Sequence, residues 1–428
     1  LNYNLQGVVN IPLIEDELGL RISGTFNRDS GWIDQPTADK EDVNDQALNN
    51  IRIKTLWQPS ESLMVKAMAI IHRNDGSSNH QEDEDGNFTQ PFNHTNFASI
   101  EDNYELYNIT ATYDFESVQI LSSTGYLDLE NLIDGHGILN PTAAPPAPPT
   151  HSETIDSYRK HRAISQEIRL IDTGDDDFQW SLGGYYESGK SPRLTNVQFG
   201  TPGPDTFLIF NNIFREPEYK QWAVFGDSNY ALTDQFKIGV GVRYFEDDRG
   251  LDDSRRIQSG TFDAVSPRAY MSYQVNENIN TFASVSKGFR SGGFNSVGQD
   301  PYEPEELLSY EVGTKMSLLD DRLKAELIYY YSEYTNYQIF AALPVGPPLS
   351  FTRNAGDSEV EGLDFLLDWL VSDEWSIGIS GNINDGEFVK VEAAPGTAAY
   401  IVGDDLPLSP EYKISVWSNY NFSWRSRQ

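Results

Sequence analysis

Residues 278–295 read Asn-Ile-Asn-Thr-Phe-Ala-Ser-Val-Ser-Lys-Gly-Phe-Arg-Ser-Gly-Gly-Phe-Asn. Within this stretch Thr281, Ala283 and Val285 alternate with asparagine, phenylalanine and serine, a period of two that predicts a β-strand. A strand of about 10 residues or more is long for a soluble domain, but it suits a tilted strand that crosses a bilayer. The run of glycine and aromatic residues over 287–294 predicts that the strand ends there and leads into a loop.

The rest of the chain repeats this unit. Alternating segments predict about 17 strands, joined by short connections of roughly 2–6 residues and long ones of roughly 10–30 residues in strict alternation. The longest predicted loops cover residues 74–99, 131–157 and 188–218. Short turns at one end and long loops at the other are typical of an outer-membrane barrel. The sequence therefore predicts an all-β fold, a transmembrane antiparallel β-barrel.

The two faces of the predicted strands support this interpretation. Between Arg322 and Tyr331, leucine, alanine and tyrosine alternate with arginine, lysine and glutamate, and residues 362–369 show the same pattern. An apolar face opposite a charged one is expected of a strand between lipid and a wet lumen. The alternative is a half-buried antiparallel sheet in a secreted enzyme or binding module, which would not explain why all the long loops fall at one end.

Composition narrows the function. The chain of 428 residues carries 65 acidic and 31 basic residues, a net charge of −34, which argues against a nucleic-acid partner. It contains no cysteine, so disulfides and thiolate metal sites are excluded. Aromatic residues make up 12%, as in strands with interfacial girdles.

Motifs for catalysis or cofactors are weak. Residues 83–87 (DEDGN) resemble part of a calcium loop, without its full spacing or its closing glutamate, and an ordinary acidic loop is the alternative. The six histidines are scattered, and neither a Gly-x-Ser-x-Gly elbow nor a phosphate-binding loop occurs. We therefore predict no enzyme, no catalytic or metal site and no cofactor.

Several blocks in order along the chain resemble the barrel of TonB-dependent outer-membrane receptors. These blocks are residues 9–13 (VNIPL), 20–24 (LRISG), 30–34 (SGWID), 283–295 (ASVSKGFRSGGFN), 304–305 (PE), 309–315 (SYEVGTK), 354–356 (NAG), 360–365 (VEGLDF) and 406–410 (LPLSP). The resemblance implies a barrel of about 22 strands, filled by an N-terminal plug domain. Residues 1–428 would then form one barrel portion, without the plug, the first strand and the last strands.

The resemblance also implies a function. A receptor of this family resides in the cell outer membrane, contacts its lipid, acts as a monomeric barrel and takes up a scarce nutrient with energy from the inner-membrane TonB complex. The extracellular ligand implied first is a ferric siderophore. Carbohydrate, haem or vitamin B12 uptake, and a passive porin-like channel, are the alternatives.

Five charged residues lie in or beside the family-like blocks, and we expect them to face the lumen. They are Arg268, Lys287, Arg290, Glu311 and Lys315. They would contact the plug or line the transport path, and the alternative is a structural charge ladder inside a polar lumen. Aromatic residues of the long loops are further candidates, for a ligand vestibule or for ordinary loop packing: Phe88, Phe92, Phe97, Phe207, Phe210 and Tyr302.

Overall fold

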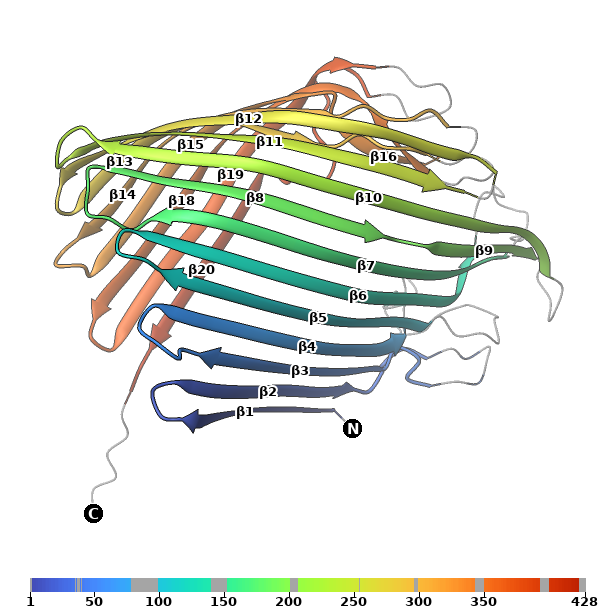
Figure 1. The fold of residues 1–428 in the computed structure, drawn as a ribbon. Helices are drawn as coiled ribbons and strands as arrows, with labels where there is room; N and C mark the ends of the chain where they lie inside the picture. The colour runs from blue at the N-terminus through green and yellow to red at the C-terminus, as the bar shows by residue number, and fades with distance from the viewer. Residues whose placement is uncertain are drawn as a thin grey trace. The chain divides into compact units, whose positions relative to one another are not determined.

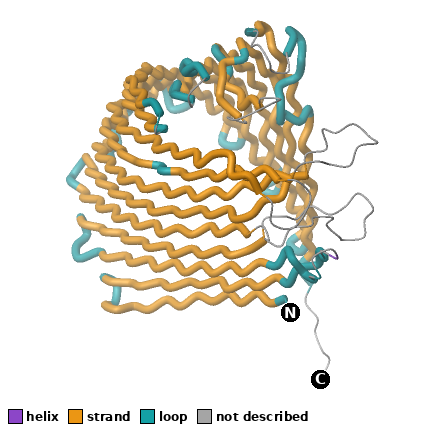
Figure 2. The backbone as a smooth tube through the Cα atoms, turned by 90° about the vertical axis from the view of Figure 1, so that its right-hand side faces the viewer, coloured by secondary structure: helices purple, strands orange, loops and turns teal. Residues whose placement is uncertain are grey.

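The protein was analysed as a computed structural model, which describes residues 2–34, 36, 39, 41–77, 99–139, 152–200, 207–253, 255–295, 299–342, 350–392 and 400–422. Strands make up nearly all of this backbone (Figure 2). None of the described residues form a helix that is long and apolar enough to cross a membrane. Eighteen of the 20 described strands belong to one sheet, and β16 and β17 form a separate hairpin.

The chain divides into two compact units, and each is described here by itself. Unit 1 contains residues 1–170, 184–222 and 248–260, and unit 2 contains residues 171–183, 223–247 and 261–428. The first strands in chain order are β1 (Tyr3–Ile14), β2 (Leu18–Asp29), β3 (Gln46–Trp57), β4 (Leu63–Ser77), β5 (Ser99–Asp114), β6 (Val118–Leu139), β7 (Ser152–Asp172), β8 (Phe178–Lys190), β9 (Arg193–Gly200) and β10 (Phe207–Ala231).

The remaining strands follow in the same order. They are β11 (Phe236–Asp252), β12 (Ile257–Asn276), β13 (Ile279–Arg290), β14 (Glu305–Leu318), β15 (Leu323–Thr335), β16 (Gln338–Ala342), β17 (Ser350–Asn354), β18 (Gly356–Ser372), β19 (Trp375–Val391) and β20 (Tyr412–Tyr420). We call the strand ends at the long connections the outer ends and those at the short turns the inner ends.

In unit 1 each of the strands β1 to β6 pairs antiparallel with the next, and these strands lie side by side in chain order (Figure 1). The β4–β5 pair runs unbroken from Leu63 opposite Tyr113 to Ser77 opposite Ser99. A slip of one residue would exchange the two faces of a strand, so the apolar and polar faces fix this register.

In unit 2 the ladder continues through β12, β13, β14, β15, β18, β19 and β20, again antiparallel. The predicted strand at residues 278–295 is β13, which pairs with β14 along its whole length, from Ile279 opposite Met316 to Arg290 opposite Glu305. The strand prediction for this stretch is confirmed.

The glycine pair that follows β13 is required by close packing. Gly293 exchanges two backbone hydrogen bonds of 3.0 Å with Tyr302. A Cβ on Gly292 would lie 2.5 Å from the Phe262 ring, and one on Gly293 would lie 2.4 Å from the Tyr302 hydroxyl oxygen. A larger residue at either position would require the neighbouring aromatic ring to move.

The two faces of the sheet differ as the sequence predicts. Tyr310, Val312 and Leu327 lie on one face of β14 and β15 and remain 44–55% exposed. Glu311, Lys315 and Glu326 lie on the opposite face. Apolar side chains left open on a continuous face match a surface that contacts lipid, whereas the opposite face is polar like a wet lumen.

The described residues form 20 strands, 18 of them in the main sheet, against about 17 predicted. The further strands lie within a predicted loop or arise where a predicted strand divides. The run 322–340 divides at Asn336, which has a positive φ of 56°, into β15 and β16. The run 351–371 divides at the fully buried Ala355 into β17 and β18. Strand β9 lies inside the predicted loop 188–218, where it pairs with β7 and β10.

Strands also extend into the predicted long loops. Strand β6 continues to Leu139, and β7 begins at Ser152, so most of residues 131–157 are strand. The prediction failed there because the apolar residues of 131–139 come in adjacent pairs, Leu132-Ile133 and Ile138-Leu139, and do not alternate with polar residues.

Candidate functional site

By strand parity four of the five candidate residues lie on the polar face of unit 2: Arg268, Arg290, Glu311 and Lys315. Arg268 in β12 lies opposite Ser286, Glu311 in β14 lies opposite Ser284, and Lys315 lies opposite Asn280. Because side chains alternate along a strand, these register pairs place Arg268, Glu311 and Lys315 on one face. That face is the one opposite Val312.

Each of these three side chains has a partner. The Arg268 Nη2 and Nε atoms lie 2.7 and 2.8 Å from Oδ2 of Asp227, and the guanidinium lies 5.6 Å from the Tyr270 ring centroid. Lys315 Nζ lies 3.1 Å from Glu326 Oε1.

Glu311 has a weaker contact, because its Oε2 accepts a hydrogen bond of 3.3 Å from Ser284. More than half of the Arg268 and Lys315 side-chain surface is open, so these ion pairs hold the side chains in place more than they stabilise the fold.

Lys287 lies on the other face of β13. It has the same parity as Val285 and forms an ion pair of 2.9 Å with Glu306, which alternates with Leu308 and Tyr310 along β14. The structure therefore places Lys287 near the outer end of the apolar face, apart from Arg268, Glu311 and Lys315. The alternation from Val285 to Lys287 was the sequence signal for this position.

Arg290 is the last residue of β13 and lies opposite Glu305, at the edge of an ordered group of outer residues. The carboxylate of Glu305 accepts a hydrogen bond of 2.5 Å from the backbone N–H of Gln338. The Gln338 side-chain amide, 7% exposed, donates to the carbonyls of Ser291 and Glu303 at 3.0 Å each. One glutamine thereby ties the end of β13, the start of β14 and the β16–β17 hairpin together.

Two asparagines extend this connection. The Asn295 amide donates to the carbonyls of Asp300 and Thr352, and its oxygen accepts from the Thr352 N–H at 3.0 Å. The Asn354 amide donates to the carbonyls of Glu303 and Asn336. We call Ser291, Asn295, Glu303, Glu305, Gln338 and Asn354 the outer network. Sequence reasoning missed Gln338, because one glutamine in a predicted strand carries no motif.

A small apolar cluster lies beneath the outer network. Its buried members are Ile339, Ala355, Phe388 and Leu406, and Tyr337, Val360, Val391 and Tyr400 pack against them. The Tyr337 and Phe388 rings meet edge to face at 5.8 Å, and the Phe388 and Tyr400 centroids are 4.8 Å apart. Burial raises the pKa of Tyr337, and the nearby Glu305 carboxylate raises it further, so its phenol stays neutral.

Other sequence candidates are placed only in part. The suspected calcium loop at 83–87 and the aromatic candidates Phe88, Phe92 and Phe97 lie outside the described residues. Phe207 and Phe210 belong to the backbone of β10. Tyr302 packs beside Gly293 next to the outer network. In the described parts of the chain, no three His, Asp or Glu side chains gather as a metal site.

The arrangement is therefore suited to binding. Long polar strands present paired charges, amides and tyrosines on one face, and a braced group of loops stands at their outer ends. Such groups hold a ligand through hydrogen bonds and ring contacts.

Comparison with known proteins decides the family. The family model for "TonB dependent receptor-like, beta-barrel" matches residues 25–427, nearly the whole chain. The chain belongs to this family. The resemblance noted in the sequence is thus confirmed, and barrels of this family are outer-membrane proteins of Gram-negative bacteria, so the chain is an outer-membrane protein.

Curated relatives of this receptor barrel are similar at low identity. The pesticin receptor of Yersinia enterocolitica is 26% identical over 277 residues, which are 62% of this chain and 39% of the relative. The metal-pseudopaline receptor CntO of Pseudomonas aeruginosa is 24% identical over 369 residues, 78% of this chain and 51% of the relative. The matched region therefore spans between about two fifths and half the length of these relatives.

Solved structures share the fold of this receptor barrel. The ferric yersiniabactin uptake receptor FyuA from Yersinia pestis superposes with a TM-score of 0.81 at 15% identity, over 99% of this chain and 64% of that chain. The siderophore receptor PiuA from Acinetobacter baumannii superposes with a TM-score of 0.75 at 14% identity, over 98% of this chain and 67% of that chain.

Proposed function

We propose that residues 1–428 form the barrel portion of a receptor that takes up a scarce metal chelate, a ferric siderophore first of all, with energy supplied through TonB. The observation that carries this proposal is the family match over residues 25–427. Relatives named as siderophore or metal-pseudopaline receptors support the class of cargo. The ordered outer network supports it as well, because its internal hydrogen bonds hold the outer strand ends in place, where a ligand would arrive from outside.

The same proposal includes the rest of the receptor. This chain covers 64% of the FyuA chain, and we assign the remainder of the receptor to a plug domain and further barrel strands. The TonB complex would act on the plug, and the barrel would work as a monomer in outer-membrane lipid. The receptor carries out no covalent chemistry, because its work is binding and gated passage.

Uptake of a radiolabelled metal chelate tests the proposal. A strain that lacks the full-length gene should lose uptake of at least one iron-loaded siderophore, and the wild-type gene should restore it, but only in a strain with functional TonB. Uptake that persists without TonB would favour a passive channel instead. Normal growth of the deletion strain under iron limitation, with no siderophore bound by the purified receptor, would refute iron as the cargo.

One matched pair of variants links uptake to the outer network. Gln338→Ala removes both side-chain hydrogen bonds that brace the network. Gln338→Glu keeps the length of the side chain, but its carboxylate cannot donate a hydrogen bond to the Ser291 and Glu303 carbonyls. Both variants should weaken chelate binding, and Ser272→Ala, on the polar face away from the network, should leave it unchanged.

A further inference from the structure

Three arginines lie side by side on neighbouring strands of unit 1, near the outer strand ends. Arg193 of β9 lies directly opposite Arg159 of β7 on one side and opposite Arg215 of β10 on the other. Strand β9 lies between β7 and β10 and pairs with both (Figure 1). Because neighbouring strands lie about 4.8 Å apart, the three side chains start from a row roughly 10 Å long. We call Arg159, Arg193 and Arg215 the arginine row.

The arginine row lies on the polar face of these strands. Side chains alternate along β7, so Arg159 points away from the side of Ile164 and Ile168, which are 51 and 52% exposed. The same alternation along β10 separates Arg215 from Val224, which is 52% exposed. Open apolar side chains of this kind mark the lipid surface. The row therefore faces the lumen side.

The arginine row also lies beyond the lipid-facing part of the strands. On the opposite face at this level, Lys190 of β8 forms ion pairs of 3.5 and 2.9 Å with Glu216 and Glu218 of β10. A surface in contact with the hydrocarbon of the bilayer would carry apolar side chains there. The row is thus on the lumen side at the outer ends, where a ligand would arrive from outside.

No carboxylate forms an ion pair with the arginine row in the part of the chain that the structure describes, whereas the adjacent Lys160, on the other face, lies 3.5 Å from Asp128 Oδ1. Arg193 Nε donates a hydrogen bond of 3.1 Å to Ser157 Oγ. The Nε of Arg215 is buried and has no hydrogen-bond partner among the described atoms. The row therefore holds strong cationic donors that lack acceptors of matching charge.

Two carboxylates in this part of unit 1 are engaged by other groups. The charge of Asp253 acts on Arg215, but its Oδ1 accepts hydrogen bonds of 3.1 and 2.8 Å from two backbone N–H groups. Glu187 of β8 lies further inward on the polar face and accepts hydrogen bonds from the hydroxyls of Tyr185 and Tyr219, the latter at 2.6 Å. Neither carboxylate is open to neutralise the whole row.

The positive charges of the row act on one another. Burial lowers the pKa of Arg193, and the charge of Arg159 lowers it further. Burial and the charge of Arg193 lower the pKa of Arg215 in the same way, while the charge of Asp253 opposes this change. Like charges directly opposite each other in an antiparallel pair repel. In a chain with a net charge of −34, an anion bound at this local reversal of sign would remove the repulsion.

Two stacked rings stand beside the row. His161, two residues along β7 from Arg159, stacks with Tyr219 at a centroid distance of 6.2 Å and an interplanar angle of 16°. The Tyr219 ring covers Gly189, where a Cβ would lie 2.5 Å from the ring. A ligand whose charged groups reach the arginines would therefore contact a flat aromatic surface next to them.

We propose that the arginine row binds the anionic oxygen atoms of the transported chelate, carboxylates first, so that the receptor selects a negatively charged iron chelate over a neutral one. The inference rests on the proposed function and names the charge class of its cargo. Each guanidinium can hold a carboxylate through two parallel N–H···O bonds, and a row of about 10 Å can engage carboxylates on more than one arm of a chelate.

Binding to the purified full-length receptor tests this selection. Ferric citrate is the anionic probe, a neutral ferric trishydroxamate is the matched probe, and quenching of tryptophan fluorescence measures the affinity for each. The receptor should bind ferric citrate more tightly. Arg193→Gln, at the centre of the row, should weaken ferric citrate binding by about 10-fold, as expected for one hydrogen bond to a charged group, and leave the affinity for the neutral probe unchanged.

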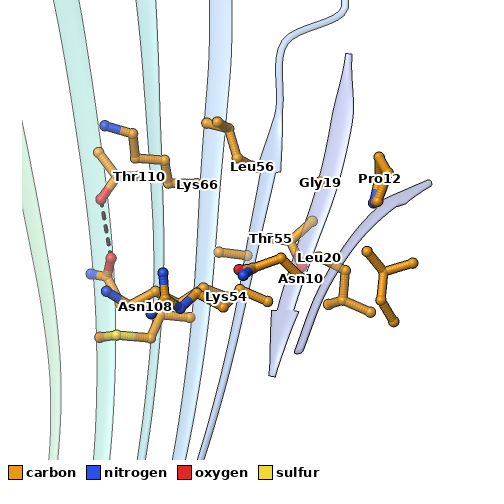
Figure 3. A pocket seen from close by; sticks show the side chains of 14 residues that line it. Asn10, Pro12, Gly19, Leu20, Lys54, Thr55, Leu56, Lys66, Asn108 and Thr110 are labelled. Carbon is orange, nitrogen blue, oxygen red and sulfur yellow. Dashed lines mark hydrogen bonds between the residues drawn. The ribbon is translucent and has the colours of Figure 1, made fainter. Parts of the chain in front are cut away.

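Cations at the other end of the strands provide the control. Arg21, Lys54 and Lys66 line a hollow of about 590 Å³ near the inner strand ends, and Figure 3 shows Lys54 and Lys66 on neighbouring strands there. Lys54→Gln removes one positive charge at that end and should bind ferric citrate like the wild type. Arg193→Lys keeps the charge without the planar fork and should retain part of the affinity. Heat-modifiable gel mobility confirms that each variant is folded.

Phenylglyoxal, which modifies open guanidinium groups, shows whether the row itself is occupied. In the intact receptor ferric citrate should slow the modification of Arg159, Arg193 and Arg215 several-fold and leave that of Arg21 unchanged, with peptide mapping by mass spectrometry as the readout. Inorganic phosphate at the same concentration should protect the row less, because it cannot reach all three guanidinium groups at once.

Three results would overturn the proposal. The first is a neutral chelate bound as tightly as ferric citrate, by the wild type and by Arg193→Gln alike. The second is modification of the row at one rate with and without ferric citrate. The third is equal protection by phosphate, which would make the row a site for free anions. If the uptake experiment refutes iron as the cargo, protection of the row by iron-free citrate would still leave a carboxylate site standing.

Discussion

Phe388→Ala offers the sharpest test of how the outer network is held. Phe388 is fully buried and contacts the Tyr337 and Tyr400 rings at 5.8 and 4.8 Å. Truncation of a buried phenylalanine costs about 3–5 kcal/mol, from lost burial and from the cavity that remains. Because this cluster is small and close to the surface, it can partly collapse, and we expect a cost near the lower limit, about 3 kcal/mol.

Amide hydrogen exchange of the full-length receptor in detergent micelles measures this cost locally. The reporters are the Ala355 N–H, bonded to Tyr337 O at 2.8 Å, and the Leu406 N–H, bonded to Gly386 O at 2.8 Å. A local loss of about 3 kcal/mol speeds their exchange by roughly 100-fold. The Val312 amide, in the middle of β14, should be unchanged.

Phe388→Leu is the matched control, because a conservative apolar replacement costs less than about 1.5 kcal/mol. Exchange at Ala355 and Leu406 that stays at the wild-type rate in Phe388→Ala would refute the view that this cluster braces the outer network. Equal acceleration at Val312 would show that the whole sheet, and not the outer network, depends on the ring.

Further predictions test the faces and the tight positions. Val312→Arg, near the middle of the apolar face of β14, should destabilise the barrel in phospholipid vesicles by about 2–4 kcal/mol, whereas Ser284→Arg on the polar face should be nearly neutral. Reversible urea unfolding, followed by tryptophan fluorescence, measures the stability of both variants. Equal effects would contradict the assigned faces. Gly356→Ala should lower the stability of the barrel by at least about 2 kcal/mol in the same assay, because the φ of Gly356 is +132° and the alanine Cβ would lie 1.9 Å from the Lys390 carbonyl oxygen. An alanine variant of unchanged stability would exclude this backbone conformation. Gln338→Leu should cost about 2 kcal/mol or more, since two carbonyls lose their donor, and unchanged stability would mean that water replaces the amide.

Much of the fold follows from local pattern. Alternation in residues 278–295 defined β13, and the regular change between short and long connections defined the barrel class. Breaks in long predicted strands could not be found in this way. Asn336 takes a positive φ, and Ala355 is enclosed by the apolar cluster, and neither residue type requires such a position by itself.

The sequence likewise predicted only part of the candidate site. Sequence blocks pointed to five residues as lumen-facing, and for Lys287 that expectation was wrong, because its register opposite Leu308 places it on the apolar face with Val285. The partners of these residues were not readable, because Asp227 and Glu326 meet them only through pairing between strands. Gln338 gained its role through contacts with Ser291 and Glu303, whose separation in sequence no local pattern encodes.

The sequence by itself determined that this protein is a long-stranded antiparallel sheet with one apolar and one polar face, because side-chain direction in a strand depends only on position. The tertiary structure decided which charges meet. Arg21 and Lys54 lie 33 residues apart along the chain and Lys54 and Lys66 lie 12 apart, and the register of β2, β3 and β4 brings all three together on one face. Register is a property of paired strands, so a cluster of this kind exists only in the folded sheet.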